Sequence, residues 1–427
     1  MKLFIVLLTG AFMLATGTSD VFAKKKEKVQ TEAKSDTVRT ASKKRNTQYP
    51  RLFKNKRVVT KKGLITIHKI DDKLYFEFPK SLLGREFLMG SSISATSDNT
   101  SGLVGQTMTT PLHIRFAIQE DQVYMQNVTP VSRMDVYSNQ SDISKAVAKS
   151  NITPDMESFK IAAYNMDSTA VVFEVTKFFL ADNKRLPLFD QNSSSLEDEK
   201  YGQLELKAVL KKNLSSIRNF YVFDDNLEIN LDMSFYQSLL ASKKEVRGGN
   251  VRVKAVYSML LLPEETMVWR LGDPRLGYTF TKKQKISTEK DGTAFSYLQH
   301  KWNLLPADEE AYRRGDLVAP RKPVVFYIDS DFPEAWKKAI KEGVNWWNEA
   351  FKMAGFKDAV QTADFPANDT TFYAGNLKYS CIRYVPVNLS KTQSKVWVDP
   401  RSGEIINGTI FVGHDIAKTI EIGRAHV

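Results

Sequence analysis

Residues 322–356, KPVVFYIDSDFPEAWKKAIKEGVNWWNEAFKMAGF, indicate the fold class, because they predict one buried strand followed by one amphipathic helix. The apolar run 324–328 is typical of a strand that is covered on both faces. We expect Asp331 to cap the helix and Pro333 to lie in its first turn, where a missing N–H costs nothing. A strand and one covering helix do not enclose a core, so we expect further strands of the same sheet to follow.

The predicted helix should turn one apolar face toward this sheet and end at Gly355. The residues of that face recur at helical spacing: Trp336, Ile340, Val344, Trp347, Phe351 and Ala354. Trp346 lies about 100° from Trp347 around the helix axis, so we expect Trp346 to be the more exposed of the two. Strand patterns at 379–385, 395–398 and 405–412, with a turn at 399–403, complete a strand-helix-strands unit over residues 316–420.

The chain before this unit is β-rich in pattern. Residues 49–100 predict a small β accessory domain with a turn at Asp71 and Asp72. Residues 101–315 predict an antiparallel, sandwich-like β accessory domain with a hairpin turn at 165–168. Short helices are expected near 142–149 and 308–314. The expected fold class is therefore multidomain α+β, with β-rich N-terminal domains followed by an α/β domain.

The net charge of +12 comes from one N-terminal segment. Residues 24–62 hold fifteen Lys or Arg and three Asp or Glu, and the rest of the chain is balanced. Because its first part, 24–48, has few aromatic residues and no periodicity, we interpret it as a basic, disordered arm. Weak contact of residues 24–62 with an anionic envelope surface is an open alternative. Specific nucleic-acid binding is not expected, since no recognition motif accompanies the charge.

The first 23 residues have the features of a secretory signal peptide. Lys2 precedes an apolar core at 3–15 that is too short to span a bilayer, and Val21 and Ala23 suit cleavage after Ala23. An uncleaved N-terminal anchor is the alternative. We expect an exported protein, located in the periplasm, in the cell envelope or outside the cell. Its single cysteine, Cys381, excludes an intramolecular disulfide.

The sequence offers no recognisable catalytic or metal-binding motif. Its five histidines include no pair four residues apart and no His-Glu dipeptide, which zinc hydrolases use. We expect His68, His113 and His300 to be structural, and favour the same for His414, whose position just past a strand leaves a functional role open. Cys381 is expected to be a small buried apolar group and not a nucleophile. We therefore assign no catalytic or metal-ligating residue, and the substrate-binding residues are unknown.

Several stretches together resemble a family of secreted zinc-dependent metallopeptidases common in Bacteroidota. The similar stretches include 62–88 (KGLITIHKIDDKLYFEFPKSLLGREFL), 111–126, 143–151, 164–179, 273–280, 322–329, 334–360, 379–385 and 398–405. The resemblance implies two N-terminal domains of unknown function followed by a metzincin-like catalytic domain, of which 316–420 would be the first, incomplete part. In such families a later helix with the motif HExxHxxGxxH supplies three zinc ligands and a general base.

This chain ends before such a helix, so none of the family's metal or catalytic residues can be placed on it. Its last seven residues, EIGRAHV, equal the translation of a common sequencing adapter. We therefore expect residues 421–427 to be adapter read-through, and Ile420 to be the last natural residue.

Two functional hypotheses follow. The first is that the chain is the N-terminal fragment of an exported zinc-dependent metalloendopeptidase, with zinc and a peptide or protein substrate in the intact parent. The fragment itself is then expected to be inactive and to hold no zinc. The alternative is a non-catalytic, exported binding or scaffolding protein of the cell envelope. The oligomeric state is not predicted.

Overall fold

The computed structural model describes residues 48–99, 102–129, 134–136, 141–189, 196–198, 200–286, 293–369, 371–386, 392–416 and 418. The described residues all belong to one compact unit. The predicted signal peptide, residues 24–47 of the basic arm and residues 421–427 lie outside the described residues. Within the described part of the chain, no helix is both long enough and apolar enough to cross a membrane.

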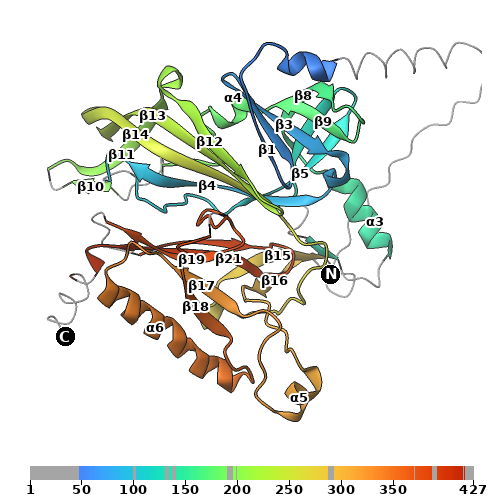
Figure 1. Ribbon diagram of the computed structural model, residues 1–427, viewed down its shortest axis with the longest axis vertical. Helices are drawn as coiled ribbons and strands as arrows, with labels where there is room; N and C mark the ends of the chain where they lie inside the picture. Colours follow the sequence, from blue (N-terminus) through green and yellow to red (C-terminus); the bar gives the residue numbers. More distant parts are fainter. Residues whose placement is uncertain are drawn as a thin grey trace, which may run out of the picture. The chain divides into compact units, whose positions relative to one another are not determined.

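The described strands form three sheets, of thirteen, three and five strands. The largest is antiparallel throughout and runs in the order β1-β2-β3-β9-β8-β6-β5-β4-β14-β13-β11-β10, with β12 paired to β13 outside this path. Its strands are β1 Val58–Lys62, β2 Thr66–Ile70, β3 Lys73–Pro79, β4 Glu86–Thr96, β5 Leu112–Gln119, β6 Gln122–Asn127, β8 Asp155–Tyr164, β9 Ala170–Glu174, β10 Leu196–Asp198, β11 Gly202–Leu210, β12 Ser216–Val222, β13 Asn226–Ala241 and β14 Lys244–Leu261. Strands from both predicted accessory domains therefore share one sheet (Figure 1).

This large sheet curls around a single aromatic core, so its first strands come to lie beside β12. Backbone N–H of Leu64 donates to the carbonyl of Phe223 at 2.6 Å, and Nζ of Lys69 donates to the carbonyl of Ile217 at 2.7 Å. Inside the curl, the aromatic side chains that are almost completely buried are Phe76, Phe78, Phe87, Phe116, Phe173, Phe179, Phe189, Phe235 and Tyr257. The antiparallel prediction is confirmed, but one curled sheet forms where we expected a sandwich of two.

Local turns and short helices agree with their predicted positions. Asp71 has a φ of 53° in the β2–β3 turn, and Ser168 has a φ of 61° in the β8–β9 turn. Helix α3 spans Ser141–Ser150, and helix α5 spans Glu309–Arg314. Asp308 caps α5, because its Oδ1 accepts the backbone N–H of Ala311 at 2.9 Å. A one-turn helix, α4 (Thr176–Phe179), follows β9.

The three-stranded sheet has the order β16-β15-β7 and comprises β7 Met134–Val136, β15 Phe280–Ile286 and β16 Thr293–Gln299. β15 and β16 are antiparallel, whereas β7 is parallel to β15. The chain then leads from β16 to the five-stranded sheet. The segment after β16 bonds to the turn before β21 of that sheet, since Lys301 N–H donates to the carbonyl of Gly403 at 3.0 Å.

The five-stranded sheet has the order β18-β17-β19-β21-β20. It comprises β17 Val324–Ile328, β18 Val360–Asp364, β19 Ser380–Val385, β20 Gln393–Val398 and β21 Ile405–Gly413. β17 pairs in parallel with β18 and β19, β19 pairs in parallel with β21, and β20 is the antiparallel edge. Helix α6, Glu334–Met353, connects β17 to β18. The predicted strands and helix of this unit are confirmed, whereas β18 was not predicted.

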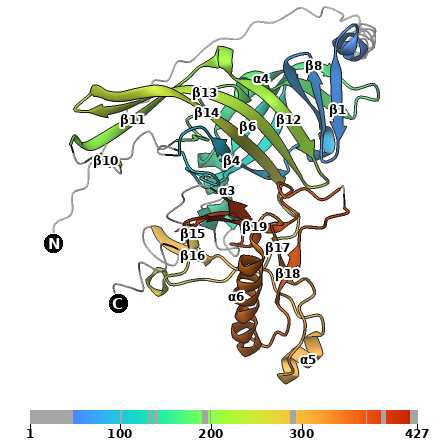
Figure 2. The same ribbon diagram turned by 60° about the vertical axis from the view of Figure 1, so that its left-hand side comes forward.

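The sheet lies between α6 and the large sheet (Figures 1 and 2). Ile382, Tyr384, Ile410 and Val412 pack in one cluster with the apolar side chains of α6. Because side chains alternate along a strand, the residues between them face the large sheet. Trp397, fully buried on that second face, packs with Leu88 and Leu260 of the large sheet.

The start of α6 differs from the prediction. Asp331 does not cap the helix; Pro333 precedes it, and its carbonyl accepts the N–H of Trp336 at 2.9 Å. Asp329 fixes the segment that leads into the helix. One of its carboxylate oxygens accepts the backbone N–H of Asp331 at 3.2 Å, and the other accepts the backbone N–H of Tyr384 at 3.3 Å. These bonds join the helix entry to β19. The predicted stop is confirmed, because Gly355 has a φ of +85°.

The covered face of α6 also differs from the prediction. Trp336, Ile340 and Val344 pack toward the sheet as expected. Trp347, however, is 66% exposed, and Trp346 is 76% exposed. Asn348, four residues after Val344, points toward the sheet instead. Its side-chain amide donates to the carbonyl of Val360 at 2.8 Å, and its side-chain oxygen accepts the Val360 N–H at 3.0 Å. The expected burial of Trp347 is therefore wrong, and so is that of Ala354, which is exposed.

Candidate functional site

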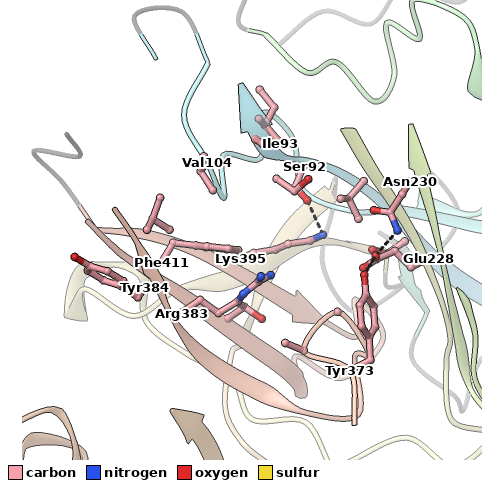
Figure 3. A pocket seen from close by; sticks show the side chains of 18 of the residues that line it. Ser92, Ile93, Val104, Glu228, Asn230, Tyr373, Arg383, Tyr384, Lys395 and Phe411 are labelled. Atoms are coloured by element: carbon pink, nitrogen blue, oxygen red, sulfur yellow. Dashed lines mark hydrogen bonds between the residues drawn. The ribbon is translucent and has the colours of Figure 1, made fainter. Parts of the chain in front are cut away.

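A cavity of about 520 Å³ lies between the large sheet and the five-stranded sheet. The large sheet contributes Ser92 from β4 and Glu228 and Asn230 from β13. The smaller sheet contributes Arg383 from β19 and Lys395 from β20. Figure 3 shows these side chains together with Tyr373, which precedes β19.

Lys395 is the most unusual residue of this cavity. It lies in the middle of the edge strand β20 and is 8% exposed. Its ammonium donates to Oγ of Ser92 at 3.3 Å and lies 4.9 Å from the ring centroid of Trp397. Burial lowers the pKa of Lys395 to about 8, and the charge of Glu228 opposes this change. A fraction of the side chain is therefore neutral near physiological pH.

Glu228 is held by neighbouring donors. Its Oε1 accepts the hydroxyl of Tyr373 at 2.5 Å and the amide of Asn230 at 2.8 Å. Burial and the neighbouring Glu228 carboxylate raise the pKa of Tyr373, so this hydroxyl stays protonated and donates. Tyr373 also stacks on Tyr221 of β12, with ring centroids 4.1 Å apart. These contacts fix the 373–379 loop on the large sheet and form one wall of the cavity.

A second polar contact fixes the same loop. Asn226, completely buried at the start of β13, donates through Nδ2 to Oδ1 of Asn376 at 2.9 Å. Its Oδ1 accepts the N–H of Leu377 at 3.3 Å. Since buried amides are costly without partners, these two hydrogen bonds of Asn226 specify how the loop docks.

Arg383 supplies the second cation of the cavity. It is partly buried, and its guanidinium carbon lies 5.7 Å from the ring centroid of Phe411. Val385 and Phe411 form a small apolar cluster with Leu103 and Val104 at this side of the cavity. The cavity thus has a polar part around Lys395 and Glu228 and an apolar part around Phe411, which is the composition typical of ligand pockets.

Three of the histidines that we expected to be structural lie in polar contacts away from this cavity. His68 lies 2.9 Å from Glu77, and His113 lies 2.9 Å from Glu86, in each case through Nε2. His300 contacts the hydroxyl of Thr281 at 3.0 Å, and burial lowers its pKa.

His414 is exposed, on the α6 side of the five-stranded sheet. Its Nδ1 lies 2.5 Å from the hydroxyl of Tyr384, and its ring stacks on Trp336 at a centroid distance of 5.8 Å. Cys381 is completely buried in β19, and burial raises the pKa of its thiol to about 12, which leaves it unreactive. Across the described residues, no group of three His, Cys, Asp or Glu side chains could hold a metal ion.

Sequence reasoning singled out none of the cavity residues. The available signal was weak: Glu228 and Asn230 occupy polar positions of the regular apolar/polar alternation of β13, and Lys395 stands between a small and an apolar residue of β20. A polar residue in a strand ordinarily faces water, so this pattern does not reveal burial. The contact between Lys395 and Ser92 joins residues 303 positions apart, which local pattern cannot anticipate.

Comparison with family models gave two matches. Residues 47–96 match DUF5118, and residues 105–307 match DUF5117, each described as a domain of unknown function. Comparison with curated proteins and with solved structures gave no match. The two matched regions lie in the large sheet and in the segment that leads through β15 and β16. The two matches are consistent with two N-terminal domains of unknown function, DUF5118 followed by DUF5117.

Proposed function

We propose that this chain is the N-terminal part of an exported zinc-dependent metallopeptidase, in which residues 316–420 begin a metzincin-like catalytic domain. The main support is the topology of the five-stranded sheet. Its parallel strands, its antiparallel edge strand β20 and the connecting helix α6 agree with the strand-helix-strands order that the family resemblance implies. The two domains of unknown function that precede this unit also agree with the resemblance.

The described residues do not fit a catalytic zinc ion. Such a site needs three protein ligands and an open position for water. His414 and Cys381 belong to the same sheet unit, but Cys381 is buried within β19, and the part of the chain that the structure describes brings no three candidate ligands together. We therefore assign no catalytic step to these residues. In the proposed parent, the ligands and the general base would come from sequence C-terminal to residue 420.

The gene itself provides the test. The reading frame should be followed past Ile420 in an uninterrupted genomic assembly. We expect an HExxH motif within about one hundred residues, on a helix that follows β21. The complete product should then bind stoichiometric zinc and hydrolyse a protein substrate in a chelator-sensitive manner. Changing the glutamate of that motif to glutamine is the matched control, and it should abolish hydrolysis without loss of zinc. A natural stop codon without the motif would refute the proposal.

The cavity between the sheets favours a second candidate, an exported binding protein of the cell envelope. This function requires no residue outside the described chain. It predicts that the 427-residue chain binds a ligand by itself. Both candidates require export, so the mature protein in the cell envelope should begin at Lys24. Mass spectrometry of its N-terminus tests this requirement, and an intact Met1 would contradict it.

A further inference from the structure

We propose that the cavity between the two sheets binds a small molecule with one carboxylate and an apolar body, and that the carboxylate lies between the ammonium of Lys395 and the guanidinium of Arg383. This site lies on the face of the five-stranded sheet opposite α6. It is independent of the proposed peptidase activity, because no zinc and no peptide hydrolysis enter the argument.

The first observation is that the cavity holds two cations without an ion-pair partner among the described residues. Lys395 donates one hydrogen bond, of 3.3 Å, to a neutral hydroxyl. Arg383 lies over the ring of Phe411 and forms no hydrogen bond to a described residue. Buried charges are ordinarily paired, and guanidinium groups bind carboxylates through two parallel hydrogen bonds. Figure 3 shows both side chains reaching into the same cavity.

The carboxylate already present, Glu228, does not neutralise the two cations. Its Oε1 is occupied by Tyr373 and Asn230, and it forms no ion pair with Lys395 within the described chain. The charged side chains that line the cavity are Glu228, Arg383 and Lys395, so the lining carries one net positive charge. One added carboxylate balances that charge, whereas a phosphate dianion would reverse it.

The second observation is the apolar part of the cavity. Ile93, Val104 and Phe411 line it beside the two cations. Figure 3 places Ile93 and Val104 on the large-sheet side and Phe411 on the other side. The volume of about 520 Å³ falls within the range of small-molecule pockets. A ligand with a carboxylate at one end and an apolar body at the other matches both parts.

A structural role in joining the two sheets does not explain why Lys395 is buried. A single long hydrogen bond to a serine offsets little of the cost of burying an ammonium group. The sheets are already joined by Trp397 and by the hydrogen bonds of Asn226 with Asn376 and Leu377. A cation that is unfavourable for stability and points into a cavity is typical of a binding residue.

Fluorescence titration of the full chain with dansylglycine at about pH 7 tests the proposal, because this probe has one carboxylate and an apolar naphthalene body. Dansylglycinamide, which has the same body but no charge, is the matched probe. We expect dansylglycine to bind at least about tenfold more tightly than the amide. Lys395→Met and Arg383→Met should each weaken dansylglycine binding about tenfold or more and leave binding of the amide unchanged. Lys338→Met, which removes an exposed lysine of α6, should alter neither.

The melting temperature separates binding from a structural role, since Lys395→Met should melt at the same temperature as the wild type or higher. Acetate should displace dansylglycine at lower concentration than inorganic phosphate. The proposal is overturned by equal affinity for the two probes, by undiminished binding to the Lys395→Met variant, or by a lower melting temperature of that variant. Tighter competition by phosphate than by acetate would also overturn it, because the site would then be one for phosphate.

Discussion

Replacement of Lys395 by methionine should stabilise the protein at neutral pH, although it removes a hydrogen bond. Burial lowers the pKa of this lysine from 10.5 to about 8. At about 1.4 kcal/mol per pKa unit, the charged side chain at pH 7 costs the folded protein about 3 kcal/mol relative to a neutral side chain. Methionine has a similar length and no charge, so Lys395→Met should raise the free energy of unfolding by about 2–3 kcal/mol.

The pH dependence follows from the same comparison. Below about pH 8 the lysine is protonated in both the folded and the unfolded states, so the full cost is present. Between about pH 8 and 10.5 the folded protein releases the proton while the unfolded chain keeps it, so the wild type gains stability relative to the variant. Above that range the difference should vanish.

Urea unfolding of the wild type and of Lys395→Met, followed by circular dichroism at about pH 7, 9 and 10.5, measures this difference. Other titrating groups change the free energy of unfolding of both proteins equally, so they do not change the difference between them. Lys338→Met serves as the control, because Lys338 is exposed and should give no difference at any of these pH values. The reasoning is refuted if Lys395→Met is less stable than the wild type at pH 7, or if the difference does not change with pH.

Three further comparisons test the packing, each by urea unfolding. Asn348→Ala should lower the free energy of unfolding by about 1–3 kcal/mol, because it removes two hydrogen bonds to a strand. Trp347→Ala should lower it by less than about 1 kcal/mol. If Trp347→Ala proved the more costly change, Trp347 and not Asn348 would face the sheet, as the sequence predicts. Tyr373→Phe should cost about 1–3 kcal/mol, because it removes a donor to a buried carboxylate, and an unchanged stability would contradict that bond. Gly105→Ala should cost more than Gly202→Ala: both glycines have positive φ, but the added methyl meets the Phe411 ring at position 105 and open space at position 202. Equal costs would contradict this contact.

The elements that the sequence determined are those encoded by neighbouring residues. Short apolar strand patterns predicted β17, β19, β20 and β21, and turn residues predicted the β2–β3 and β8–β9 connections. Helical spacing followed by glycine predicted α6 and its end. Each of these patterns involves residues a few positions apart, so it can be recognised in the sequence without knowledge of the fold. The β-rich character of the protein follows from the same patterns.

Tertiary structure decided which polar and apolar residues are buried. Helical spacing ranks Trp347 above Asn348 as an inward residue, but the amide of Asn348 pairs with the free backbone of Val360, and Trp347 remains in solvent. The curl of the large sheet likewise depends on the pairing of all thirteen strands and on the aromatic core that they enclose.

The cavity depends on tertiary structure most of all. Glu228, Arg383 and Lys395 come from strands of two different sheets, and in each strand they could equally have faced water. Their burial results from the docking of the five-stranded sheet on the large one. A charged residue in a strand pattern carries no sign of its partner, because electrostatic cost depends on the solvent that the whole fold excludes and not on the neighbouring residues in the chain.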